Sequence, residues 1–131
     1  MAYSKIREDL IFPELSFKIV GCAFEVFNSL GAGHKEKVFQ KAMSIQFGAD
    51  NIHFKEQIYH PLIFKKNKLE KNYFDFLVED KVVVELKRSD YFTKDHFEQL
   101  NHYLRISKLQ LGLLISFTTN GVRFKRVVNL T

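Results

Sequence analysis

The sequence predicts a fold of the α/β (α+β) class, a mixed β-sheet flanked by helices, with elements in the order α-α-β-β-β-α-β-β. Apolar residues recur at helical spacing in three segments, and runs rich in aromatic and β-branched residues, typical of strands, fill the rest. The chain has 131 residues, no internal repeat and no linker rich in proline, glycine or serine. We therefore expect a single domain over residues 1–131.

Two helices are predicted in the N-terminal part of the chain. The first runs from residue 13 or 16 to residue 29, because Gly31 is a natural stop, and the second covers residues 34–47. The side chains expected to face the core are Val20, Ala23, Phe24, Phe27 and Leu30 in the first helix, and Val38, Ala42 and Ile45 in the second, with Phe39 and Met43 beside them.

Five strands and a third helix are predicted in the remainder. Pro61, inside the run over residues 54–64, indicates an edge strand or a bulge. A Lys-Asn-Lys turn at residues 66–68 follows. The other strands are expected over residues 73–78, 82–87, 109–117 and 122–128, and the helix over residues 93–106 with Phe97, Leu100 and Leu104 facing the core. Asn120-Gly121 predicts a hairpin between the last two strands, and the apolar run 111–115 is typical of a central strand.

The predicted hairpin over residues 73–87 brings charged side chains together. If residues 79–81 form the turn, Val78 pairs with Val82, and counting outward places Asp75 opposite Glu85. Lys87 lies on the same face as Glu85, because side chains alternate along a strand. Opposed carboxylates repel each other, and a divalent cation reverses the sign of that interaction. Hard oxygen ligands suit Mg²⁺, so these residues predict metal-assisted phosphodiester hydrolysis.

These charged residues also have an interpretation that needs no metal. Asp75, Glu85 and Lys87 also fit a solvated ion-pair cluster, although the strand around Glu85 is apolar on both faces and a charge inside such a strand is expensive unless paired or coordinated. Glu36 lies on a partly apolar flank of the second helix, from which an acid can point over the hairpin. Its alternative role is that of a first-turn glutamate favoured by the helix dipole.

These residues carry a resemblance to the PD-(D/E)xK nuclease superfamily. Asp75 followed by Val83-Val84-Glu85-Leu86-Lys87 is similar to its D … (D/E)-x-K signature. Residues 30–39 resemble the motif that names the small GxxExxY proteins of that superfamily: Gly33 and Glu36 match, and Phe39 stands where the family has tyrosine. Gln99 and Tyr103 resemble a Q-x-x-x-Y helix motif, and residues 111–117 the strand after it. The resemblance runs from about residue 16 to residue 128.

The resemblance implies a restriction-endonuclease-like sheet and a nuclease that acts on nucleic acid, with DNA as the expected substrate. It implies Asp75, Glu85 and Glu36 as ligands of Mg²⁺, for which Mn²⁺ is the expected substitute, and Lys87 as the catalytic lysine. Gln99 and Tyr103 would orient substrate phosphate or a ligand carboxylate, but they equally fit a polar stripe at the sheet edge. The alternative function is a nucleic-acid or protein binding module on the same fold without turnover.

Composition limits the partners and the compartment. The net charge of +5 favours a polyanionic partner, and positive areas are expected at residues 65–68, at residues 123–126 and at Lys87-Arg88, where Arg88 would support substrate binding. Cys22 is the lone cysteine, the segment from Met1 leads into charge, and no apolar run approaches the roughly 20 residues that cross a bilayer, so a cytoplasmic protein without a membrane partner is expected. A homodimer or larger complex is expected to supply base specificity, because the chain has no separate recognition domain.

Overall fold

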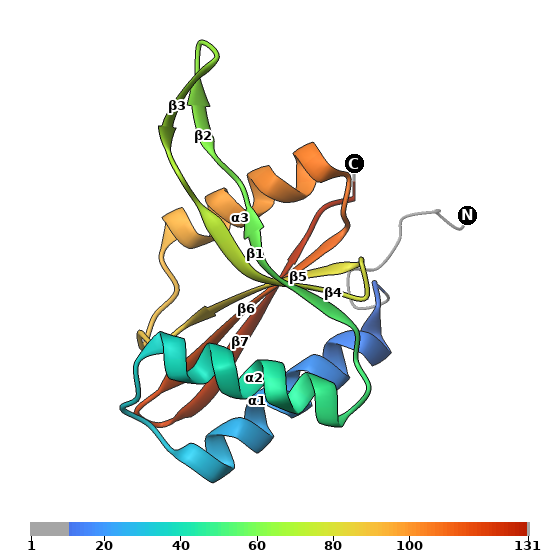
Figure 1. The fold of residues 1–131 in the computed structure, drawn as a ribbon, viewed down its shortest axis with the longest axis vertical. Helices are drawn as coiled ribbons and strands as arrows, with labels where there is room; N and C mark the ends of the chain where they lie inside the picture. Colours follow the sequence, from blue (N-terminus) through green and yellow to red (C-terminus); the bar gives the residue numbers. More distant parts are fainter. Residues whose placement is uncertain (1–10, 131) are drawn as a thin grey trace, which may run out of the picture.

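The computed structural model describes residues 11–130, so the charged segment that begins at Met1 lies outside the described part. Its elements follow one another as shown in Figure 1: α1 Pro13–Leu30, α2 Glu36–Ala49, β1 Phe54–Tyr59, β2 Leu62–Phe64, β3 Asn67–Glu70, β4 Tyr73–Val78, β5 Val82–Lys87, α3 Lys94–Ser107, β6 Leu111–Thr118 and β7 Gly121–Val128. The fold is the predicted mixed sheet flanked by helices, consistent with a restriction-endonuclease-like architecture.

The main sheet has five strands in the order β1-β4-β5-β6-β7. Neighbouring strands are antiparallel except β5 and β6, which run parallel and are connected through α3. Every residue of β6 is buried, which confirms the prediction of a central strand. β1 lies at one edge, as the position of Pro61 indicated.

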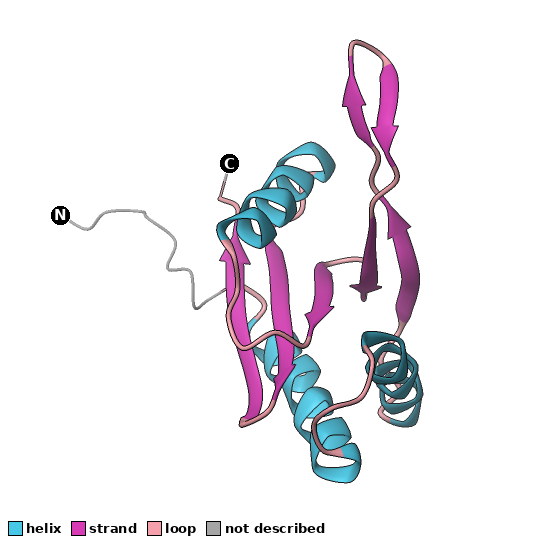
Figure 2. Ribbon diagram, turned by 90° about the vertical axis from the view of Figure 1, so that its left-hand side faces the viewer, coloured by secondary structure: helices cyan, strands magenta, loops and turns pink. Residues whose placement is uncertain are grey.

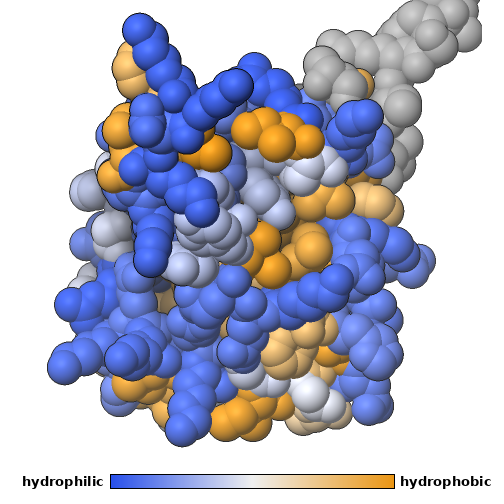
Figure 3. Space-filling view, turned by 45° about the horizontal axis from the view of Figure 1, so that its top comes forward, coloured by the Kyte–Doolittle hydropathy of each residue, from blue (hydrophilic) through white to orange (hydrophobic). Residues whose placement is uncertain are grey.

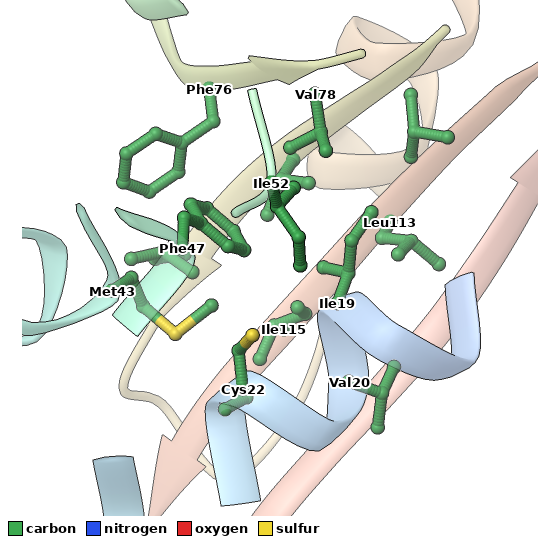
Figure 4. Close-up of a cluster of buried hydrophobic side chains, with 14 of the residues drawn as sticks. Ile19, Val20, Cys22, Met43, Phe47, Ile52, Phe76, Val78, Leu113 and Ile115 are labelled. Carbon is green, nitrogen blue, oxygen red and sulfur yellow. The ribbon is translucent and has the colours of Figure 1, made fainter. Parts of the chain in front are cut away.

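Helices α1 and α2 cover one face of this sheet. In the close-up of Figure 4, Ile19 of α1 and Met43 and Phe47 of α2 lie with Phe76 of β4 and Ile115 of β6 in one apolar cluster. The ring of Phe47 meets that of Phe76 edge to face, with centroids 5.2 Å apart. This cluster contains most of the buried hydrophobic residues of the described chain, and burial of apolar surface drives folding.

The predicted core-facing stripes of the first two helices were partly wrong. Phe24 and Leu30 of α1 are exposed, and so are Val38 and Ile45 of α2. The side chains that the two helices bury are Ile19, Val20, Cys22, Ala23 and Val26 in α1, and Phe39, Met43 and Phe47 in α2. Both helices carry apolar residues on more than one side, so spacing alone did not define which side packs on the sheet.

Helix α3 packs on the opposite face. Leu100 and Leu104 are fully buried against Val83 and Leu114, as predicted, and Phe97 packs partly buried at the margin. Gly112 of β6 lies directly under Leu100, and a Cβ atom added there would come within 2.7 Å of the Leu100 side chain. A larger residue at this position would therefore force the Leu100 side chain or α3 to shift.

The prediction of one strand over residues 54–64 was wrong. The segment contains two strands, and β2 leaves the main sheet to pair with an unpredicted strand, β3, in a separate ribbon. The turn falls on Lys65 and Lys66, whose φ angles of 49° and 66° are left-handed, one residue before the expected position. We call residues 60–72, which project from the body in Figure 2, the arm.

The surface of the described residues is varied in polarity. The face seen in Figure 3 is mostly hydrophilic, with apolar side chains gathered in separate patches. None of the helices among residues 11–130 combines the length and the apolar character needed to cross a membrane.

Candidate active site

The hairpin of β4 and β5 sets the register of the candidate site. Glu79 and Asp80 occupy left-handed turn positions, with φ angles of 53° and 55°, and the Lys81 N–H donates to the Val78 carbonyl at 2.9 Å. Val78 pairs with Val82 and Phe76 with Val84, as predicted. This register places Asp75 across from Glu85.

The carboxyl groups of Asp75 and Glu85 each accept a backbone N–H from the neighbouring strand. The Asp75 N–H donates to Oε1 of Glu85 at 3.2 Å, and the Leu86 N–H donates to Oδ2 of Asp75 at 2.7 Å. The backbones of β4 and β5 pair at only three positions, from Phe76 and Val84 to the turn. The side chains of Asp75 and Glu85 bridge the two strands just beyond the last of these pairs. The two carboxylates are therefore fixed on the sheet itself and not on a mobile loop.

An irregularity in β1 accompanies this arrangement. Gln57, which the register places across from Asp75, has a left-handed φ angle of 53°. On either side of Asp75, Phe76 belongs to the cluster under α1 and α2, whereas Phe74 belongs to the cluster under α3. Residues two apart on a regular strand share a face, so the strand twists at Asp75 and the carboxyl group is turned toward β5.

Lys87 lies beside the acid pair. Its Nζ atom is 3.6 Å from Oε2 of Glu85, and the two side chains are 24% and 14% exposed, respectively. Glu85 and Lys87 share the face of Val83, which carries α3. The ammonium group thus lies near the carboxylates and still reaches solvent.

Burial and repulsion change the protonation of Glu85. Burial raises its pKa from an ordinary 4.5 to about 9, and the hydrogen bond with Asp75 and the negative charge of Asp75 act in the same direction. The charge of Lys87 and the N–H of Asp75 oppose the shift without cancelling it. The two carboxyl groups therefore titrate as a pair, and the pair holds a proton at neutral pH when no cation is bound.

The raised pKa of Glu85 bears on whether Asp75 and Glu85 can bind a divalent metal ion. A buried carboxyl group that shares its surroundings with a second carboxylate keeps a proton because nothing else neutralises it. A divalent cation replaces that proton and is bound well by paired carboxylate oxygens. The donor chemistry of Asp75 and Glu85 therefore fits Mg²⁺ or Mn²⁺.

Glu36 occupies a different position from the other two acids. It is the first residue of α2 and is exposed, and among residues 11–130 no group of three or more acid, histidine or cysteine side chains gathers closely enough to hold a metal ion. The structure therefore brings Asp75 and Glu85 together without Glu36. The loop before Glu36 is nevertheless tied to the site, since Nη1 of Arg88 donates to the His34 carbonyl at 3.0 Å.

The polar stripe of α3 flanks the site at its first turn. Thr93 caps the helix, accepting from the His96 N–H, and its own N–H donates to Nδ1 of His96. Burial and the charge of Lys87 lower the pKa of His96, and the charge of Asp95 acts in the opposite direction. Gln99 is exposed on the next turn.

Tyr103 lies in an aromatic cluster with His60 and Phe74. Its ring centroid lies 5.0 Å from that of His60 and 4.9 Å from that of Phe74, and burial raises the pKa of its hydroxyl. The sequence did not indicate this cluster or the bend at Gln57, since glutamine is an unusual residue for a left-handed φ angle.

The fold and the site together define an α+β protein with two opposed carboxylates and a lysine on adjacent strands. The chain belongs to the PD-(D/E)XK nuclease superfamily, whose model matches residues 13–127. Members of this superfamily are generally metal-dependent nucleases. No curated protein matches the chain.

Among solved structures, that of SSO0001 is similar, with a TM-score of 0.52 and 18% sequence identity. The alignment covers 94% of this chain but only 60% of SSO0001. At this level of identity the likeness supports the fold alone.

Proposed function

We propose that this protein is a Mg²⁺-dependent nuclease of the GxxExxY type that hydrolyses phosphodiester bonds, with DNA as its expected substrate. The observation that carries the proposal is the pair of partly buried carboxyl groups of Asp75 and Glu85, each held by a backbone N–H of the neighbouring strand, beside the ammonium group of Lys87. Membership of the nuclease superfamily supports the same chemistry.

In this proposal each residue has a defined task. Asp75 and Glu85 would hold the cation, and Glu36 would assist at its outer side through water or substrate. When bound, the cation would polarise the phosphate and lower the pKa of a bound water. The Lys87 ammonium would orient the attacking water and offset negative charge on the phosphate during attack.

The remaining proposed residues position these groups. Arg88 fixes the loop that leads to Glu36, through the His34 carbonyl, and Gln99 is free to meet substrate from the first turns of α3. Phe39, where the GxxExxY motif has tyrosine, is fully buried, and its ring stacks on that of Phe117 with centroids 4.2 Å apart. The side chain at this position of the motif therefore packs in the core. This supports a fold that stays intact without the tyrosine hydroxyl.

The test is cleavage of plasmid DNA, single-stranded DNA and RNA, each with Mg²⁺, Mn²⁺ or EDTA. We expect metal-dependent cleavage, a loss of at least about a hundredfold in Asp75→Asn, Glu85→Gln and Lys87→Ala, and a smaller loss in the exposed Glu36→Gln. The matched control is Asp80→Asn. Asp80 is an acid of the same hairpin whose carboxylate contacts Lys55 at 3.1 Å in the turn, and asparagine tolerates its left-handed backbone.

Two results would count against the nuclease proposal. Cleavage that persists in EDTA or in Asp75→Asn would point to a contaminating enzyme. Binding without cleavage on every substrate would favour the alternative, a nucleic-acid binding module on the same fold.

A further inference from the structure

The arm (residues 60–72) contributes nothing to either apolar cluster among the described residues. β2 and β3 pair only with each other, and all their residues are exposed, including Leu62, Ile63 and Phe64. A two-stranded ribbon by itself is marginally stable in water. The arm exposes apolar side chains and adds nothing to the core. We therefore attribute a binding role to it.

The base of the arm is nevertheless held firmly against the body. The His60 N–H donates to the Asn72 carbonyl at 2.7 Å, and the rings of Tyr59 and Tyr73 lie 5.2 Å apart across the two strands. The His60 ring also contacts Tyr103 of α3. The arm therefore projects in a defined direction, which Figure 2 shows.

The arm holds most of the excess positive charge of the protein. It contains Lys65, Lys66, Lys68 and Lys71 with one acid, Glu70, a net charge of +3 against +5 for the whole chain. Lys65 and Lys66 form the tip, and Nζ of Lys68 lies 5.5 Å from the ring centre of Tyr59. Such a concentration of lysines among apolar and aromatic side chains attracts a polyanion.

The two sides of the arm differ in charge. Leu62 and Glu70 face α3, where they line a hollow of about 440 Å³ together with Asp95 and Glu98. Three acids make this hollow less favourable for phosphate groups than the tip, although Gln99, a proposed substrate-binding residue, lines it too. The tip and the side that carries Lys68 are therefore the parts open to a polyanion.

We propose that the arm lies in the major groove of a B-form DNA duplex beside the bond that the site cleaves, an inference that rests on the proposed nuclease function. Paired strands lie about 4.8 Å apart, so a two-stranded ribbon with its side chains fits the roughly 12 Å width of that groove. The deep, narrow major groove of A-form RNA does not admit such a ribbon. The arm thus selects duplex DNA over RNA and over single strands.

The position of the arm fixes where it touches the duplex. Tyr73, at its base, precedes Asp75 by two residues, and Asn67, near the tip, precedes Asp75 by eight. At about 3.3 Å per residue the tip lies up to about 26 Å from the carboxylates, or about seven to eight base pairs of B-DNA. The arm then extends the contact with DNA on one side of the cleaved bond.

A second copy of the chain fits the arm less well. In a symmetric dimer that joins the two arms, the same surface packs on itself, so two segments of net charge +3 would be brought together. Like charges brought together in this way are repulsive. The charge of the arm therefore favours DNA over self-association.

The test removes the tip charges while keeping the turn. Lys65→Asn with Lys66→Gly removes two positive charges and introduces the asparagine and glycine that left-handed hairpin turns prefer, so the variant keeps its fold. The control is Lys18→Gln with Lys41→Gln, which removes two exposed lysines from α1 and α2. Fluorescence anisotropy in EDTA, at several salt concentrations, measures binding to a 30-base-pair duplex DNA, to single-stranded DNA and to duplex RNA.

We expect the tip variant to bind duplex DNA roughly tenfold more weakly, with a salt slope smaller by about 1.8, while the control stays near wild type. Duplexes with fewer than about seven base pairs on each side of the cut should show no difference between variants. An equal loss on single-stranded DNA or duplex RNA would overturn the groove assignment. Unchanged duplex affinity would overturn the arm as a DNA contact. So would a change that appears only in the oligomeric state of the protein, measured by sedimentation.

These results are separable from those of the nuclease proposal. Metal-dependent cleavage by wild type, with duplex affinity unchanged in the tip variant, refutes the arm inference and leaves the nuclease proposal intact. Arm-dependent duplex binding without cleavage of any substrate refutes the nuclease proposal and leaves the arm as a DNA contact.

Discussion

At the scale of single residues, Asp75 serves both chemistry and structure. Its carboxylate accepts the N–H of Leu86, a residue that is only 2% exposed. The same carboxylate raises the pKa of Glu85. Substitutions at this position therefore change stability as well as metal binding, and the two effects have to be separated.

Asp75→Ala and Asp75→Asn provide that separation. Both remove the charge, but only asparagine keeps an oxygen for the buried Leu86 N–H. We expect Asp75→Ala to be less stable than Asp75→Asn by about 1–3 kcal/mol, the cost of leaving a buried donor unsatisfied. Urea unfolding in EDTA measures the difference, and equal stability of the two variants would show that water reaches this N–H.

Glu85 makes stability depend on pH in the metal-free protein. Its pKa is about 9 in the folded state and near 4.5 when unfolded, so between these values the folded state holds a proton that the unfolded state has lost. The free energy of unfolding should fall as pH rises through this window, by up to a factor of about ten in the folding equilibrium constant per pH unit.

Glu85→Gln imitates the protonated form and should remove this dependence. Urea unfolding of both proteins in EDTA, at pH 5.5, 7 and 8.5, should show a growing advantage for the variant as pH rises. Titrating groups far from Glu85 are common to the two proteins and cancel in the difference, so the difference reports the titration of Glu85 together with Asp75, to which it is coupled. Parallel pH profiles would mean that Glu85 titrates normally.

The acid pair could be predicted from the sequence because a hairpin register follows from its turn. Once Val78 was paired with Val82, counting placed Asp75 across from Glu85, and the structure has this register. The left-handed Gln57 could not be predicted, because no local residue preference calls for it. Whether Glu36 joins the site depends on how α2 packs, which spacing does not define.

At the scale of elements, the strands and the helix boundaries were easier to predict than the faces of the helices. β4 and β5 have the predicted bounds, because strand-forming residues end there at a charged turn. α1 and α2 bury only part of the faces expected: Val20 and Ala23 are buried, but Phe24 and Ile45 remain exposed. The arm was missed because its apolar run continues from β1, which made two strands resemble one.

Gly112 tests how closely α3 must lie to the sheet. Gly112→Ala would place a methyl group against Leu100, which is fully buried and has little room to move. We expect a loss of about 1–3 kcal/mol in the free energy of unfolding. The control Gly21→Ala, in α1, meets no atom within 4 Å and should stabilise the helix by about 0.5–1 kcal/mol. A neutral Gly112→Ala would mean that α3 shifts freely.

At the scale of the whole molecule, two apolar clusters lie on opposite faces of one sheet and share its central strand. Leu113 and Ile115 of β6 belong to the cluster under α1 and α2, whereas Leu114 belongs to the cluster under α3. A strand that contributes to both clusters cannot leave one of them without disturbing the other. The two faces should therefore unfold together, in line with the prediction of a single domain.

Truncation of a core side chain on either face tests this cooperativity. Met43→Ala under α2 and Leu104→Ala in α3 should each cost about 2–5 kcal/mol, because both side chains are fully buried. Each variant should still unfold in a single transition that is the same by circular dichroism and by tyrosine fluorescence. Two separate transitions in either variant would show that the faces are independent.

The position of β6 also matters for production of the protein. This strand is apolar along nearly its whole length and obtains its second neighbour only from β7, close to the C-terminal end of the sequence. Without β7 it would present an unpaired hydrophobic edge, the kind of edge that recruits other chains into aggregates. Truncations that remove residues 121–128 should consequently precipitate, while fusion partners attached beyond them leave this edge covered.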